Sequence, residues 1–137
     1  MRRKLTKQDL LDMGISIRED PLNYSGYEIM HQSSLRMHET RLHPSLNIKR
    51  HKYGKDKAYY IVSWSLMGKT ISFPLQRVIY AWFFGEVPSD MDVDHIDNDS
   101  LNNSVYNLQL LTRKENIAKR QRQANQYVCM KEKEHDR

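Results

Sequence analysis

Apolar residues alternate in two short runs near the middle of the chain and then recur at helical spacing. The segments KAYYIVSWSL and TISF are rich in β-branched and aromatic residues and flank MGK, which predicts a β-hairpin with a glycine-containing turn. In PLQRVIYAWFFG, Pro74 suits the first helical turn and Gly85 a helix end. The apolar positions of this helix share one face, at Leu75, Val78, Ile79 and Trp82 or Phe83. We therefore expect a hairpin followed by the helix that carries the central core.

The next segments follow the order strand, loop, strand, helix. MDVDHID predicts a short strand that enters a polar loop, and NLQLLT predicts a second strand with Leu108 and Leu110 on one face. Thr112 and Glu115 form a T-x-x-E capping box, which predicts a helix from there to about Gln123.

The N-terminal part is less regular. LTKQDLLDMG predicts a short helix with Thr6 as N-cap, Asp9 three residues later and Gly14 as its end. Residues 16–50 are polar and interrupted by proline and glycine, so we expect turns and short strands there. This segment could be an arm that crosses the surface of a partner.

Charge and composition indicate which kinds of binding partner and cellular location to expect. The chain of 137 residues has 22 Lys and Arg against 17 Asp and Glu, a net charge of +5, which favours a polyanion but is also common in soluble proteins. No run approaches the ~20 apolar residues of a membrane span, and MRRKLTKQDLLDMG lacks the apolar stretch of an export signal, so we expect a cytoplasmic protein with no membrane partner. The single Cys129 excludes an internal disulfide and a zinc site built mainly from cysteine pairs.

Negative charge is concentrated in one interval of this basic chain. Between Arg77 and Arg113 there is no Lys or Arg. The acidic residues of the interval are Glu86, Asp90, Asp92, Asp94, Asp97 and Asp99. Such an island would repel DNA unless it holds a cation that bridges carboxylate and phosphate. A solvated acidic loop is the simpler alternative. An EF-hand is a poor match, because His95 stands where the loop needs Gly and Leu101 where it needs Glu.

The segment DVDHIDNDSLNNSVYNLQLLTRKEN resembles the HNH endonucleases, in particular the homing-type enzymes of phages and introns with a D-H-I-D opening, an N-L-x-x-L-T strand and a following E-N. The resemblance covers about residues 70–120. It implies an α+β fold with a ββα-metal finger, preceded here by the hairpin and core helix. It also implies hydrolysis of double-stranded DNA with one divalent metal ion, Mg²⁺ or Mn²⁺, and, for a phage gene, the cytoplasm of a bacterial host.

The resemblance also implies roles for four residues. Asp94 and Asn116 would be the metal ligands, through a carboxylate and an amide oxygen that suit a hard cation. His95 would be the general base that activates water. Asn107 would orient the imidazole of His95 across the hairpin.

With the resemblance, we expect three regions: an N-terminal helix and irregular segment over residues 1–50, the nuclease domain over 51–126, and a flexible charged tail over 127–137. Helical spacing places Asn116, Lys119, Arg120 and Gln123 on one face. Lys119, Arg120 and Gln123 of this face are candidate DNA contacts, and so is Arg113 near the start of the helix.

Several alternatives stay open. Many relatives have a His just before the apolar helix, where this chain has Gln76, and a DNA-binding protein with an inactive finger is one reading of that change. Independently of Gln76, the protein could also be an RNA nuclease or a nonspecific toxin. The sequence leaves open the DNA site, the choice between nicking and double-strand cleavage, and the choice between monomer and homodimer.

Overall fold

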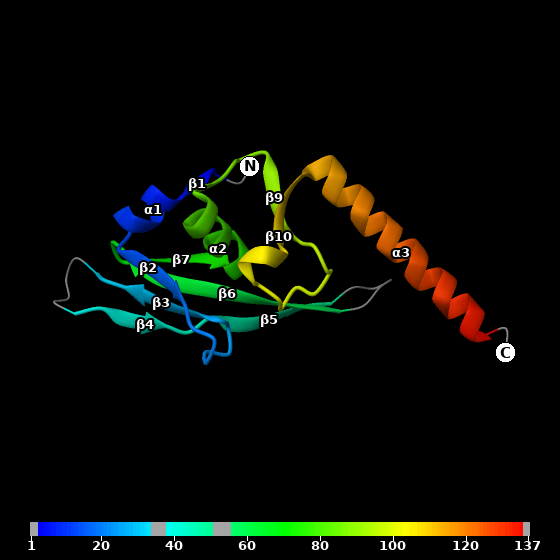
Figure 1. Ribbon diagram of the computed structural model, residues 1–137, viewed down its shortest axis with the longest axis horizontal. Coiled ribbons are helices and arrows are strands. Elements are labelled where there is room, and N and C mark those ends of the chain that lie inside the picture. The colour runs from blue at the N-terminus through cyan, green and yellow to red at the C-terminus, as the bar shows by residue number, and fades with distance from the viewer. Residues whose placement is uncertain (1–2, 34–37, 51–55, 136–137) are drawn as a thin grey trace.

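Runs of β-strands separate the α-helices in a computed structural model that describes residues 3–33, 38–50 and 56–135 (Figure 1). Its helices are α1 (Lys7–Asp12), α2 (Leu75–Phe84) and α3 (Arg113–His135), with a 3₁₀ turn η1 (Val105–Asn107). The first strands are β1 (Leu5–Thr6), β2 (Ile15–Glu19), β3 (Tyr27–His31), β4 (Thr40–Leu42) and β5 (Ser45–Lys49). The later strands are β6 (Lys57–Leu66), β7 (Lys69–Pro74), β8 (Glu86–Val87), β9 (Met91–His95) and β10 (Leu108–Thr112).

The strands of the described residues form four small antiparallel sheets. Two have three strands each, in the orders β2-β3-β4 and β5-β6-β7, and two are the pairs β1-β8 and β9-β10. The expected mixture of helices and small antiparallel sheets is therefore confirmed.

The central hairpin and helix lie where the sequence predicts them. β6 and β7 are joined at Met67 and Gly68, which have φ values of 51° and 78°, and a two-residue turn with positive φ matches the twist of antiparallel strands. Pro74 ends β7 and lies just before α2. Gly85 ends the helix with φ of 98°, a conformation that L side chains rarely adopt.

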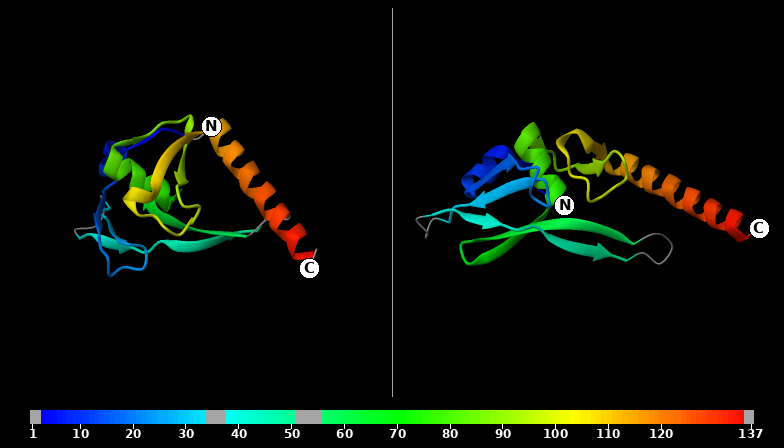
Figure 2. Two further views of the ribbon diagram at one scale, coloured as in Figure 1. Left: turned by 45° about the vertical axis from the view of Figure 1, so that its right-hand side comes forward. Right: turned by 60° about the horizontal axis from the view of Figure 1, so that its bottom comes forward.

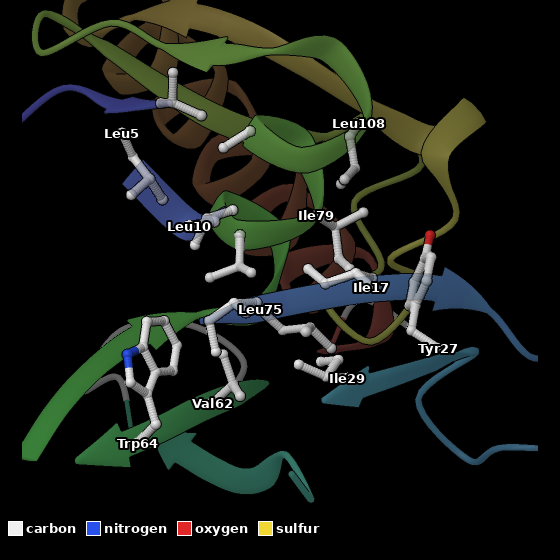
Figure 3. Packing of buried hydrophobic residues seen from close by; sticks show 14 residues of the cluster. Leu5, Leu10, Ile17, Tyr27, Ile29, Val62, Trp64, Leu75, Ile79 and Leu108 are labelled. Atoms are coloured by element: carbon white, nitrogen blue, oxygen red, sulfur yellow. The ribbon is translucent and has the colours of Figure 1, made fainter. Parts of the chain in front are cut away.

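One hydrophobic core joins the N-terminal part to the rest of the chain, with α2 at its centre (Figure 3). α2 packs against α1, β1, β6, β7, β8 and β9. The fully buried side chains include Leu10 and Ile29 from the N-terminal part and Val62, Leu75 and Ile79 from the centre. The core thus continues across residue 50, where the sequence suggested a boundary.

Residues 16–50 are more regular than their sequence suggests. β2, β3, β4 and β5 all fall largely in this segment, and β2 and β3 alternate inward through Ile15, Ile17, Tyr27 and Ile29. The apolar alternation is only two or three positions long in each strand, so intervening polar and turn residues hide it. An arm that lies outside the fold is therefore ruled out for β2 and β3.

The predicted N-terminal helix is confirmed. Thr6 Oγ1 accepts from the Asp9 amide at 3.0 Å, and Asp9 Oδ2 accepts from the Thr6 amide at 3.0 Å, which completes a capping box. Gly14 follows with φ of 82°, and a Cβ there would lie 2.2 Å from the carbonyl oxygen of Gln32. Glycine is thus required both by φ and by space.

The last helix is longer than predicted. α3 continues past Gln123 to His135, through residues for which the sequence suggested a flexible tail. Figure 2 shows it leaving the body of the protein with its C-terminal half projecting outward. Its propensity explains the extension, since residues 124–135 contain neither Gly nor Pro. No helix in the described part of the chain has the length and apolar character needed to cross a membrane.

Candidate active site

The candidate site lies where β9, β10 and the first turns of α3 meet. β9 and β10 pair in antiparallel register, with His95 opposite Leu108 and Asp94 opposite Gln109. α3 then begins at the predicted capping box, in which the Glu115 amide donates to Thr112 Oγ1 at 3.2 Å and Thr112 Oγ1 donates to Glu115 Oε1 at 2.9 Å. The sequence order strand, loop, strand, helix therefore brings residues 94 and 116 together.

A cavity of about 150 Å³ opens between these elements. It is lined by residues from β9 and its loop, from α3 and from β6: Lys57, Asp94, His95, Asn98, Ser100, Asn116, Lys119, Arg120 and Gln123. Both predicted metal ligands, the predicted base and three of the four predicted DNA contacts thus border one space.

Asp94 is the most strongly engaged carboxylate at this cavity. Its Oδ2 accepts from Gln109 Nε2 at 2.9 Å and from Lys119 Nζ at 2.5 Å. The side chains of Asp94 and Lys119 are only 15% and 17% exposed, so water screens their ion pair less than one on an open surface. Lys119 also donates to the backbone carbonyl of His95 at 2.9 Å. Lys119 therefore holds the end of β9 instead of pointing freely to a partner.

Asn116 bonds the neighbouring carboxylate. Its Nδ2 donates to Asp92 Oδ2 at 3.1 Å, which leaves the amide oxygen on the other side of the group. Asp94 and Asn116 together offer a carboxylate and an amide oxygen to one cavity, a donor pair that fits Mg²⁺ or Mn²⁺. Lys119 competes with such a cation for Asp94. Among the described residues, no group of three or more His, Cys, Asp or Glu side chains is placed to hold a metal.

His95 is buried at the end of β9, and its partner is Asn103. The ring Nε2 lies 2.7 Å from Asn103 Oδ1. Because an amide oxygen only accepts, the ring donates through Nε2, which leaves Nδ1 as the nitrogen with a free lone pair. Asn103 is 3% exposed, and its Nδ2 has no hydrogen-bond partner in the described structure. Its backbone carbonyl accepts from the hydroxyl of Tyr27, in β3, at 2.6 Å.

The sequence predicts that Asn107 orients the imidazole of His95, but the side-chain hydrogen bonds of Asn107 go to other residues. Its Nδ2 donates to Asp97 Oδ1 at 2.9 Å and to the Asn102 carbonyl at 2.8 Å, and its Oδ1 accepts from the Asp97 amide at 3.1 Å. The amide is thus fully used in closing the loop between β9 and β10. Asn107 shapes the loop that carries Asn103, so its link to His95 is indirect.

The acidic residues Asp97 and Asp99 form turns within the loop after β9. Asp97 Oδ1 accepts from the Asp99 amide at 2.8 Å, and Asp97 Oδ2 accepts from Asn102 Nδ2 at 2.9 Å. These bonds, that from Asn102 foremost, lower the pKa of the Asp97 carboxyl. Asp99 in turn accepts from the Leu101 amide at 3.0 Å. Turn formation therefore accounts for part of the acidic island.

The remaining predicted contacts divide between two hollows. Arg120 and Gln123 line the cavity described above, whereas Arg113 lines a larger neighbouring hollow of about 340 Å³ with Asp92, Ile117 and Arg120. The larger hollow holds none of the predicted ligands or the base, so the smaller one is the candidate active site. Gln76 lines neither hollow, and its buried Oε1 has no hydrogen-bond partner among the described residues.

Sequence reasoning does not find several residues at the site. Asn103 has no predicted role, Gln109 is predicted only as a strand residue, and Lys57 belongs to the predicted hairpin. Strand pairing could have indicated Gln109, because it lies opposite Asp94 once the register of β9 and β10 is fixed. The positions of Asn103 and Lys57 depend on contacts between distant segments and carry no local signal.

Comparison with known proteins agrees with this geometry. Residues 73–118, which contain α2, β9, β10 and the start of α3, match the HNH endonuclease family. The chain is 41% identical over 70 residues to an uncharacterised HNH endonuclease of Acanthamoeba polyphaga mimivirus, covering 50% of this chain and 35% of that protein. It is 40% identical over 47 residues to an SPbeta prophage-derived protein of Bacillus subtilis strain 168, named as a candidate HNH homing endonuclease. That match covers 34% of this chain and 27% of the relative.

The chain thus spans about a third or less of the length of these curated relatives. No solved structure gives a significant match. The matched segment contains every residue of the D-H, N and E-N pattern, from Asp94 to Asn116. Through this segment, the chain is similar to the HNH endonuclease family.

Proposed function

We propose that this protein is a metal-dependent endonuclease that hydrolyses phosphodiester bonds of DNA, with β9, β10 and α3 as its ββα-metal finger. The observation that carries the proposal is the single cavity bordered by Asp94, His95 and Asn116, inside the segment that matches HNH endonucleases. Each of these residue types is common in structural roles. Together they supply two oxygen ligands and a base to one site.

Asp94 and Asn116 would hold one Mg²⁺ or Mn²⁺ ion through their side-chain oxygens. When bound, the ion would stabilise negative charge on the phosphate and on the leaving 3′ oxygen. Gln109 would keep the Asp94 carboxylate in place through its hydrogen bond to Oδ2.

His95 would be the general base, acting through Nδ1. Asn103 would be its positioning residue, because the bond from Nε2 fixes both the ring orientation and the position of the proton. Water would lose a proton to Nδ1 as its oxygen attacks phosphorus, and the bond from phosphorus to the 3′ oxygen would break. The products would be a 5′ phosphate and, once the leaving 3′ oxygen takes a proton from solvent water, a 3′ hydroxyl.

A second candidate function is DNA binding without cleavage. The ion pair between Lys119 and Asp94 favours it, because an ammonium group lies where a cofactor cation would bind its carboxylate ligand. An HNH finger that keeps this pair in all conditions would lack its metal. The intact positions Asp94, His95 and Asn116 favour the nuclease.

Plasmid cleavage separates the two functions. The protein should convert supercoiled plasmid to the open circle in Mg²⁺ or Mn²⁺ and leave it intact in EDTA, since one finger holds one hydrolytic centre and nicking is the product of a monomer. Asp94→Ala should abolish cleavage, whereas Asp90→Ala, an exposed acid of the same segment that does not line the cavity, should leave it unchanged. DNA binding without cleavage by the unmodified protein would establish the second function instead. Linear product before the open circle is used up would show paired cuts.

A further inference from the structure

Lys57 borders the candidate active site, although it lies outside the segment that matches the HNH family. It begins β6 and lines the cavity together with Asp94, Asn116 and Arg120. Ser100, in the loop after β9, donates through Oγ to the backbone carbonyl of Ala58. This bond fastens the loop to the strand next to Lys57. The hairpin β5-β6 therefore forms a second wall of the cavity.

Positive charge is crowded at this wall. Lys49 in β5 is the direct cross-strand partner of Lys57, and like charges directly opposite each other destabilise a sheet. Burial of part of the side chain lowers the pKa of Lys57, and Arg120, Lys119 and Lys49 act in the same direction, whereas the Asp94 carboxylate acts against them. Such an arrangement is unfavourable in the free protein and favourable once an anion lies between the charges.

The position of the hairpin supports an extended anion. Figure 1 shows the ends of β5 and β6 on the side of the molecule toward which α3 extends, and the cavity joins residues of β6 and α3. Lys119 is already paired with Asp94. Lys57 and Arg120 are therefore the cations of this cavity best placed for an additional negative group.

We propose that Lys57, with Lys49 beside it and Arg120 across the cavity, binds a backbone phosphate of DNA next to the bond that is cut. Hairpin β5-β6 and helix α3 then hold the strand from two sides. The inference rests on the proposed function, and it adds a DNA-binding wall outside the finger. Contacts of this type are independent of base sequence and weaken with salt.

A titration with a DNA duplex tests the proposal. Binding is measured by fluorescence anisotropy in Ca²⁺ at several salt concentrations. Lys57→Gln should weaken binding roughly tenfold and reduce the slope of log K against log salt by about 0.9, the loss of one phosphate contact. Lys57→Arg should retain most of the affinity. The matched control is Lys69→Gln, an exposed lysine that begins β7 opposite Leu66, at the far end of β6, about 30 Å along the strand. It should bind as the unmodified protein does.

Thermal unfolding distinguishes lost contact from lost structure. Because Lys57→Gln removes a repulsion, its Tm should equal or exceed that of the unmodified protein while its affinity falls. If its Tm drops, Lys49→Gln replaces it and should reduce the salt slope in the same way. Salt slopes of both variants equal to that of Lys69→Gln would overturn the inference, and continued plasmid nicking would then leave the proposed function intact. Binding that follows these expectations without any cleavage would remove the nuclease and keep the DNA-binding wall.

Discussion

At the scale of single residues, the site separates chemistry from binding. His95 has its ring held by Asn103, and among the described residues it makes no side-chain hydrogen bond to Asp94 or Asn116. His95→Ala should therefore still bind DNA while single-turnover cleavage falls roughly 10²- to 10⁴-fold, the range expected for a general base. Rates at saturating protein, measured beside a DNA titration in Ca²⁺, test this. Equal losses of binding and cleavage would contradict the assignment of the base.

Asn103 and Asn107 should differ in what they lose. Asn103→Ala removes the bond to the imidazole and an unsatisfied buried donor, so cleavage should fall about tenfold or more with a small change in stability. Asn107→Ala removes three bonds that close the loop and should cost roughly 2–3 kcal/mol of unfolding free energy. Urea unfolding and single-turnover rates of both variants give the comparison. The opposite ranking would restore Asn107 as the orienting residue.

At the scale of elements, helix α3 carries both the proposed metal ligand and a cation that would compete with the metal. Lys119 lies three residues after Asn116 and holds Asp94, and a neighbouring positive charge in a partly buried site weakens the binding of a second cation. Lys119→Gln should therefore lower the Mg²⁺ concentration that gives half-maximal cleavage, by roughly tenfold. A metal titration of nicking measures it. A higher Mg²⁺ requirement would show that Lys119 acts on the substrate instead.

Elements with a continuous local signal were predictable from the sequence. The capped helix α1, the hairpin β6-β7, helix α2 and the pair β9-β10 each have a turn, cap or periodic pattern within their own residues. The strands β2, β3 and β4 have runs too short for such a pattern. They are formed by burial in the common core and by pairing with one another, which no local stretch of sequence records.

The candidate site likewise combines residues that the sequence predicts with contacts that it does not. Asp94, His95 and Asn116 follow from the motif and meet in one cavity. The partner of His95 was predicted to be Asn107 because motif spacing indicates which residues recur and not which atoms touch. Asn103 reaches the ring because Tyr27 holds its carbonyl from the N-terminal sheet.

At the scale of the whole molecule, this contact makes the base dependent on the N-terminal part. Burial raises the pKa of Tyr27 to about 12, whereas an unfolded tyrosine ionises near 10. The neutral phenol therefore stabilises the folded state fully below pH ~10, and this contribution is lost as pH rises toward 12.

Tyr27→Phe provides the matched control for this pH dependence. Phe cannot ionise, so the difference in unfolding free energy between the unmodified protein and Tyr27→Phe should shrink or reverse between pH 10 and 12. Urea unfolding at pH 8, 10 and 11 measures it. A constant difference across this range would show that Tyr27 ionises in the folded protein as it does in water.

The pairing of β1 with β8 bears on how the chain folds during synthesis. Leu5 lies opposite Val87, and Tyr27 bonds the carbonyl of residue 103, so these residues find their partners only after residues 87 and 103 have left the ribosome. Contacts between such distant positions slow folding, because a long loop must close before they form. The candidate cavity is assembled later still, since Asn116 and Arg120 follow all of these partners in the sequence. A cell that translates this chain thus meets the complete site only after Arg120 and Gln123 have been made.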